Sequence, residues 1–179
     1  MKTPTCINTL KEECNKRIIY NKESGLFTWK YNRVKGKIGK PLGSISHGYM
    51  AVSLTINGKR NNYLLHRIAW LMVYGYWPKM IDHINGIKHD NRIDNLRECD
   101  VYLNSANQGP SIRSSTGIRG VYPCWNGGYI SKILYKGKNI HIGMFKCKYE
   151  AGREYDKKMI ELHGEFARTN GSQGLLKIE

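Results

Sequence analysis

The chain has 179 residues, of which 29 are Lys or Arg and 14 are Asp or Glu, so its formal net charge is +15. This length accommodates one or two small domains, each with a modest core. The charge favours a polyanionic partner, either nucleic acid or an anionic membrane surface. A membrane partner is disfavoured because no apolar run approaches the length of a spanning helix and no basic amphipathic helix stands out. Residues 1–6 show no apolar signal-peptide region, which predicts a cytoplasmic protein.

Basic residues concentrate toward the two ends of the chain. The net charge is +9 over residues 1–65, zero over residues 66–109 and +6 over residues 110–179. A site for a divalent cation cannot be crowded with positive charge, so the neutral segment suits a metal and the flanks suit phosphate contacts. We therefore predict a basic β-rich N-terminal region (1–65), a core (66–109), a linker (110–116), a second domain (117–170) and a tail (171–179).

The N-terminal region is predicted to combine one helix with several strands. Apolar residues at helical spacing predict a helix over residues 7–20. Strands are predicted over 25–30 and 48–56, and Asn57-Gly58 is the signal of a two-residue hairpin turn with a return strand at 62–65.

Residues 66–108 follow a pattern of helix, strand, loop, strand and helix. Residues 66–74 predict an amphipathic helix that Gly75 ends. A strand containing Asp82 and His83 follows, then a polar loop over 88–95 and a short strand over 96–99. Asp100 is a suitable N-cap for a helix over 101–107.

Four residues of this segment together predict phosphodiester cleavage: Asp82, His83, Asn95 and Asn104. Cleavage requires that a water is deprotonated, the phosphorane stabilised and the leaving oxygen neutralised, and one imidazole with one divalent cation can do all three. Asp82 and the helical Asn104 can meet at one cation, while His83 faces the substrate from the other side of its strand. Asn95 can bridge backbone groups across the loop and hold His83 in one tautomer.

The donor atoms indicate which metal is expected. The oxygens of Asp82 and Asn104 are hard ligands, which suit Mg²⁺ or Mn²⁺ rather than Zn²⁺. With two protein ligands, phosphate oxygens and water would complete the coordination shell, so metal should bind the free protein weakly. The five cysteines contain no Cys-x-x-Cys pair, which argues against structural zinc. No small-molecule cofactor is expected.

Several residues of the segment also have non-catalytic interpretations. The Asp-His-x-Asn-Gly sequence alone could be a solvated hairpin turn, but the intervals to Asn95 and Asn104 argue against that interpretation. His66, at a helix start, is expected to pack on the site. His89, in the loop, is expected to be exposed. Arg97 is expected to contact a DNA phosphate.

This segment resembles the HNH (His-Asn-His, ββα-metal) endonucleases. It is similar in particular to the phage and intron-encoded homing subgroup, in which Asp and Asn replace the metal-binding histidines. The matching stretches are residues 66–70 (HRIAW), 82–86 (DHING), 90–92 (DNR) and 94–97 (DNLR). The resemblance implies that Asp82 and Asn104 are metal ligands, that His83 is the general base and that Asn95 is the structural asparagine.

The second domain is predicted to be three strands followed by one helix. The strands are expected over residues 120–122, 128–134 and 138–143, and the helix over 149–163 with Gly164 as its C-terminal cap. Basic and aromatic residues alternate on one face of the predicted sheet, which suits DNA. A basic packing module is the alternative.

Residues 115–170 resemble the ethylene-response-factor (ERF, APETALA-type) DNA-binding domain. The matching pieces are Arg119-Gly120-Val121, Trp125, Gly128-Tyr129, residues 142–145 (IGMF), Glu150-Ala151, Tyr155-Asp156, Gly164 and residues 166–170 (FARTN). In that family the sheet lies in the major groove. The resemblance implies that DNA is contacted by Arg119, Tyr122, Trp125, Lys132 and His141. Positions where the family often carries arginine are Tyr122, Leu134 and Asn139 here, so the target sequence does not follow.

Together these patterns predict an α+β protein: a β-rich N-terminal region, a ββα-metal nuclease core, and a small three-stranded antiparallel sheet with a helix. The predicted activity is that of an endodeoxyribonuclease dependent on Mg²⁺ or Mn²⁺. It would nick double-stranded DNA, leave 5′-phosphate and 3′-hydroxyl ends, and act as a monomer or weak dimer. If a phage encodes it, the host cytoplasm is the expected location. A non-catalytic DNA-binding regulator on an HNH scaffold is the alternative. RNA binding or cleavage is a third possibility, because charge does not distinguish the two polymers.

Overall fold

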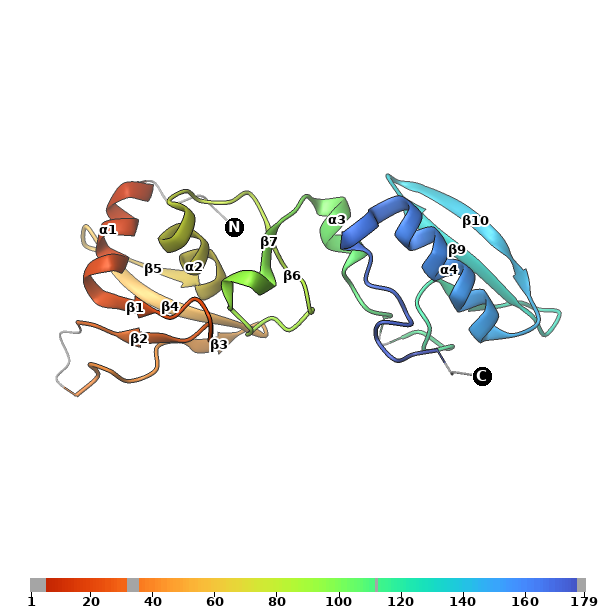
Figure 1. Cartoon of the computed structure of the whole chain (residues 1–179), viewed down its shortest axis with the longest axis horizontal. Helices are drawn as coiled ribbons and strands as arrows, with labels where there is room; N and C mark the ends of the chain where they lie inside the picture. Colours follow the sequence, from red (N-terminus) through yellow and green to blue (C-terminus); the bar gives the residue numbers. More distant parts are fainter. Residues whose placement is uncertain (1–5, 32–35, 112, 177–179) are drawn as a thin grey trace. The chain divides into compact units, whose positions relative to one another are not determined.

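The computed structural model describes residues 6–31, 36–111 and 113–176, and it divides the chain into two compact units, Met1–Cys99 and Asp100–Glu179 (Figure 1). Both units combine helices with small antiparallel sheets, which confirms the predicted α+β class. The division falls upstream of the linker predicted at residues 110–116. Of the basic residues in the N-terminal region, Lys2, Arg33 and Lys35 lie outside the described part of the chain.

The first helix is shorter than its apolar periodicity predicts. Helix α1 spans Ile7–Arg17, and the chain then enters strand β1 (Ile18–Tyr20), which pairs antiparallel with β2 (Phe27–Trp29). The predicted helix over residues 7–20 is therefore wrong in its last three positions. Ile18 and Ile19 are β-branched and favour extended backbone, and they pair in register with Trp29 and Thr28 of β2.

A three-stranded antiparallel sheet forms the centre of the first unit. Its strands are β3 (Ser44–Ser46), β4 (Tyr49–Ile56) and β5 (Lys59–Leu64), in the order β3-β4-β5. The predicted hairpin turn is confirmed, since Asn57 and Gly58 both adopt positive φ, 49° and 75°. A two-residue turn of this kind matches the twist of the flanking strands.

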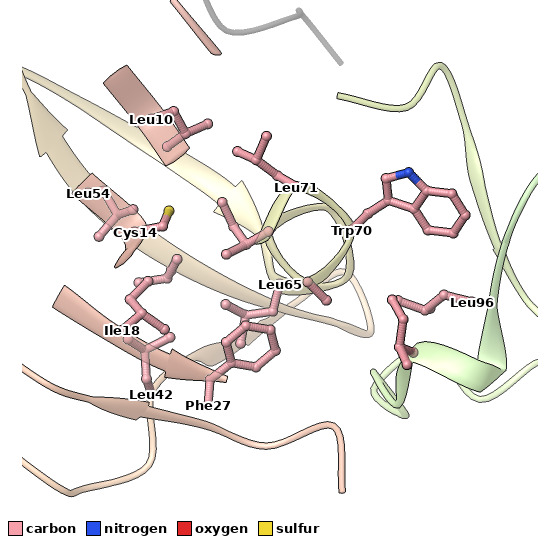
Figure 2. Packing of buried hydrophobic residues seen from close by; sticks show 14 of the residues in the cluster. Leu10, Cys14, Ile18, Phe27, Leu42, Leu54, Leu65, Trp70, Leu71 and Leu96 are labelled. Atoms are coloured by element: carbon pink, nitrogen blue, oxygen red, sulfur yellow. The ribbon is translucent and has the colours of Figure 1, made fainter. Parts of the chain in front are cut away.

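Helix α2 (Leu65–Tyr74) contributes many of the buried residues in the core of this unit. Its residues from Leu65 to Leu71 are all buried, and Gly75 ends the helix with a φ of 84°. Figure 2 shows Leu65, Trp70 and Leu71 of α2 among side chains of α1, β1, β2, β4 and β7. The predicted helix over residues 66–74 is thus confirmed. Because its first two turns are buried, α2 is held firmly in the core.

The Asp-His strand is fixed to this core. Strands β6 (Ile81–His83) and β7 (Leu96–Glu98) form a two-stranded antiparallel sheet, and a 3₁₀ turn, η1 (Ile93–Asn95), precedes β7. Ile81, Ile93 and Leu96 are each at most 8% exposed and belong to the same apolar cluster as α2. The two short strands therefore gain their stability from the core rather than from their own few hydrogen bonds.

The second unit begins with a capped helix. Helix α3 (Val101–Ala106) starts at Asp100, whose Oδ1 accepts from the backbone N–H of Leu103 at 2.8 Å, as predicted for an N-cap. Ala106 is buried together with Ile133, Tyr155 and Met159. Helix α3 is therefore packed into the core of this unit.

The predicted three strands and helix are present in the second unit. Strands β8 (Val121–Pro123), β9 (Tyr129–Tyr135) and β10 (Lys138–Phe145) form an antiparallel sheet in the order β10-β9-β8. Helix α4 (Lys148–His163) packs on β9 and β10, and a 3₁₀ turn, η2 (Gly164–Phe166), follows. One face of the sheet is thus covered by the helix (Figure 1).

The segment after α4 is anchored by a buried acid. Asp156 Oδ1 accepts from the backbone and side-chain N–H groups of Asn170, at 2.8 and 2.9 Å, and Oδ2 accepts from the N–H of Gly171 at 2.8 Å. Asn170 Oδ1 in turn accepts from the N–H of Arg119 at 2.8 Å. These bonds join α4 to the segment just before β8 and to the segment after η2.

Within the described residues, no helix has the length and apolar character needed to cross a membrane.

Candidate active site

His83 lies in a small aromatic enclosure within the first unit. Its ring packs edge-on against His66 of α2, with centroids 5.1 Å apart, and lies 5.9 Å from the ring of Tyr49 of β4. Tyr49 and His66 are themselves 5.2 Å apart. Two elements, α2 and β4, thus restrict the ring of His83, which is only 4% exposed. His66 packs on the site, as its position at a helix start predicts.

Burial keeps both imidazoles uncharged at neutral pH. It lowers the pKa of His83, although the Asn91 side chain and the charge of Asp82 oppose the shift. It also lowers the pKa of His66 to about 3, and the nearby His83 adds to that shift. The Nδ1 atom of His66 is buried without a hydrogen-bond partner among the described residues. A neutral imidazole has a lone pair, so His83 is in the state that accepts a proton.

Asp82 is paired with Arg97 across the two strands. The Oδ2 atom of Asp82 accepts from Nε and Nη2 of Arg97, at 3.1 and 2.9 Å. The two side chains are 7% and 15% exposed. Asp82 and Arg97 stand directly opposite each other in the β6–β7 register, which brings their side chains to one face. Sequence reasoning missed this ion pair, because it required the register of two three-residue strands.

Asn95 bridges the two ends of the loop between β6 and β7. Its Oδ1 accepts from the N–H of Asn85 at 3.0 Å, and its Nδ2 donates to the carbonyl of Asp90 at 2.8 Å. The backbone carbonyl of Asn95 also accepts from the N–H of Ile84 at 2.9 Å. This is the backbone bridge expected from the sequence. The effect of Asn95 on the tautomer of His83 stays a prediction.

The same loop is held from the other side by the β1–β2 hairpin. The hydroxyl of Tyr20 donates to the carbonyl of Asn91 at 2.7 Å, and the N–H of Ile93 donates to the carbonyl of Lys22 at 3.0 Å. Gly25 approaches so closely that an added Cβ would lie 2.7 Å from the carbonyl carbon of Asn91. These contacts join residues about 70 positions apart, so the sequence offered no local signal for them.

Residues 63–104 match the family model of the HNH endonucleases. The match begins at the end of β5, includes α2, β6, the bridged loop and β7, and reaches Asn104. It covers less than half of the chain, and a search of curated proteins returned no match. The match supports a nuclease of the HNH type, hence a hydrolase that acts on DNA. It coincides with the segment whose spacing predicted that activity.

The metal ligands predicted for the HNH segment come from both compact units. Asp82 lies on β6 of the first unit, whereas Asn104 lies on α3 of the second, half-buried, with its N–H donating to the carbonyl of Asp100 at 2.9 Å. Across the described residues, no three His, Cys, Asp or Glu side chains gather in a metal-binding cluster. A buried carboxylate beside His83 fits a hard divalent ion with few protein ligands. The pairing of Asp82 with Asn104 stays a prediction.

The solvent face of the β8–β10 sheet gathers three of the residues predicted to contact DNA. Lys132 of β9 and His141 of β10 are exposed and directly paired in register. The Nζ atom of Lys132 lies 4.6 Å from the ring centroid of Tyr122 on β8. Trp125, in the loop after β8, is 95% exposed. Along β9, buried Ser131 and Ile133 alternate with exposed Lys132 and Leu134. Contact of this face with DNA stays a prediction.

Arg119 has a structural role that sequence reasoning did not anticipate. Its guanidinium donates to the backbone carbonyls of Ser105, Ala106 and Gln108, at 2.7, 2.6 and 2.5 Å. Carbonyls at the end of a helix lack intrahelical partners, and a cation there satisfies them. The guanidinium of Arg119 thus caps the C-terminal end of α3, and the DNA contact predicted for Arg119 stays a prediction.

Proposed function

We propose that this protein is a divalent-metal-dependent endodeoxyribonuclease that nicks double-stranded DNA and leaves 5′-phosphate and 3′-hydroxyl ends. The observation that carries the proposal is the buried, neutral His83 beside a buried carboxylate, Asp82, within the segment that matches the HNH family. A neutral base next to an acidic ligand is the minimum that metal-assisted hydrolysis requires.

Each side chain then has a distinct role in the reaction. His83 takes the proton from the attacking water, and the rings of His66 and Tyr49 limit its rotation. Asp82 and Asn104 would hold Mg²⁺ or Mn²⁺. When bound, the ion supplies charge stabilisation at the phosphorane and at the departing 3′ oxygen. Asn95 keeps the loop closed beside His83.

The second unit would hold the substrate. Its exposed sheet face presents Lys132, His141 and Tyr122, with the exposed Trp125 nearby in sequence, a combination of cation and aromatic groups that suits phosphates and base edges. We infer that these four residues contact DNA in the manner of an ERF-type sheet. From the resemblance to the phage and homing subgroup, we also infer a monomer or weak dimer in the cytoplasm, that of the host cell if a phage or mobile element encodes the chain.

The rival function is a non-catalytic DNA-binding regulator. One observation favours it: Arg97 occupies an oxygen of Asp82, the acid that would have to bind the metal. The rival predicts DNA binding without cleavage and no requirement for a divalent ion.

A plasmid-nicking assay distinguishes the two. Supercoiled plasmid is incubated with the protein and Mg²⁺, with an EDTA control and the variants His83→Ala and His89→Ala. His89 is an exposed histidine of the same loop and serves as the matched control. We expect conversion to open circles, abolition by EDTA, a loss of about 10²-fold or more in His83→Ala, and little change in His89→Ala. Nicks that DNA ligase reseals would identify the end groups. Unchanged plasmid would support the regulator, and cleavage that survives His83→Ala would exclude His83 as the base.

A further inference from the structure

The Asp82–Arg97 ion pair lies at the centre of the candidate site and is largely removed from solvent. Nε and Nη2 of Arg97 both donate to Oδ2 of Asp82. The side chains are only 7% and 15% exposed, in contrast to the nearby pair of Asp90 and Arg92, where the arginine is 52% exposed. A buried carboxylate needs a counter-charge, and Arg97 provides it in this structure.

The same carboxylate is the proposed metal ligand, so two cations compete for it. A guanidinium and a divalent ion that share one carboxylate repel each other, and the repulsion is stronger where water is excluded. Metal binding at Asp82 is therefore more favourable when a further anion binds Arg97. The planar fork of arginine matches a phosphate as well as it matches a carboxylate, and bound DNA would bring phosphates to this site.

We propose that Arg97 is an internal counter-ion that exchanges Asp82 for a DNA phosphate, and that it thereby couples metal binding to DNA binding. Without DNA, Arg97 neutralises Asp82 and keeps the affinity for metal low. With DNA, the ion takes the carboxylate and the guanidinium takes a phosphate oxygen close to the scissile bond. Because linkage is reciprocal, each ligand tightens the binding of the other. This inference rests on the proposed function only in taking Asp82 as a metal ligand and DNA as the substrate.

The first test measures Mn²⁺ binding to the full chain without DNA, by titration with detection of free Mn²⁺ by electron paramagnetic resonance. The proteins are wild type, Arg97→Gln, Arg92→Gln and Asp82→Asn. Because Arg97→Gln removes the competing cation, we expect it to bind Mn²⁺ about tenfold more tightly than wild type. Arg92→Gln, which removes the exposed pair, should match wild type. Asp82→Asn should lose the site. Equal or weaker Mn²⁺ binding by folded Arg97→Gln would overturn the proposal.

The second test measures the coupling itself. Affinity for a DNA duplex is measured with and without Mn²⁺ in the His83→Ala background, which prevents cleavage. We expect Mn²⁺ to tighten DNA binding about tenfold in His83→Ala and less than about twofold in the double variant with Arg97→Gln. If Arg97→Gln does not fold, Arg97→Met replaces it, because methionine also removes the charge and keeps a long, flexible side chain. Coupling unchanged in the substituted protein would overturn the proposal.

These measurements separate the two proposals because none of them depends on cleavage. If the plasmid stays intact while Mn²⁺ and DNA bind cooperatively through Arg97, the proposed nuclease activity is refuted and the proposed counter-ion exchange is supported. Plasmid that is nicked by a protein without such coupling would refute the exchange and leave the nuclease standing.

Discussion

Replacing Asn95 by Ala tests whether the loop bridge stabilises the first unit and positions His83. The substitution removes two hydrogen bonds, one from the N–H of Asn85 and one to the carbonyl of Asp90, at 3.0 and 2.8 Å. A part-buried hydrogen bond contributes about 1 kcal/mol, and a donor left without a partner costs somewhat more. Since Asn95 is only 7% exposed, we expect the free energy of unfolding to fall by about 2–3 kcal/mol.

The assay is urea unfolding followed by circular dichroism, together with hydrogen exchange at the Asn85 amide. Exchange of that amide should accelerate more than exchange in α2, because the loop opens before the core does. Asn62→Ala is the control, since Asn62 is exposed and its side-chain oxygen accepts from the hydroxyl of Ser53 on the neighbouring strand; this substitution should lower the free energy of unfolding by less than about 0.5 kcal/mol. Asn95→Asp keeps the acceptor for Asn85 but turns a carboxylate oxygen toward the carbonyl of Asp90, so its loss of stability should be at least as large as that of Asn95→Ala.

The result that would refute this reasoning is a loss below about 0.5 kcal/mol in Asn95→Ala with unchanged exchange at Asn85. If stability falls as expected but plasmid nicking continues at the wild-type rate, the bridge stabilises the loop without positioning His83. If Asn95→Ala is fully folded under the assay conditions and still nicks plasmid more slowly than wild type, Asn95 positions His83.

Three further predictions concern the hairpin support, the buried histidine and the DNA face. Gly25→Ala should lower the free energy of unfolding in urea by about 3 kcal/mol or more, because φ is +70° and the added Cβ would clash with the backbone of Asn91 and Arg92. Gly58→Ala is the control: its φ is also positive, +75°, but the added Cβ meets open space, so the loss should be only about 1 kcal/mol. The folded-state pKa of His66, about 3, lies below its unfolded value of 6.5, so the unfolded chain binds the extra proton and stability falls as the pH drops from 6.5 toward 3. His66→Leu should therefore flatten the stability–pH curve in that window by up to about 1.4 kcal/mol per pH unit, and an unchanged slope would contradict the burial of a neutral His66. Lys132→Ala should reduce the slope of log affinity for DNA against log salt by about 1, whereas Leu134→Ala, also exposed on β9, should leave it unchanged.

Local patterns predicted most of the secondary structure. The alternation over residues 49–56, the Asn57-Gly58 turn and the Asp100 cap all depend on neighbouring residues and were confirmed. The first helix was predicted too long because Ile18 and Ile19 also fit a helical period. Pairing with β2, a contact outside the periodic window, decided their conformation.

The candidate site shows the same division between local and distant contacts. Asp82, His83, Asn95 and Asn104 were enough to predict phosphodiester cleavage. The segment resembles the HNH endonucleases, and residues 63–104 match the model of that family. The pairing of Asp82 with Arg97 and the ring contacts of His83 required strand register and the packing of α2. The hydrogen bonds of Arg119 to the end of α3 likewise required the second unit to fold.

The sequence by itself determined the chemistry available to this protein: a base, hard oxygen ligands and basic flanks, in an order that resembles one class of nuclease. Tertiary structure decided the state of those groups. Burial against α2 and β4 makes His83 neutral, and the β6–β7 register gives Asp82 its counter-ion. The physical reason is that charge state depends on solvent exclusion and on neighbours brought together by folding, and neither is encoded in the spacing of residues along the chain.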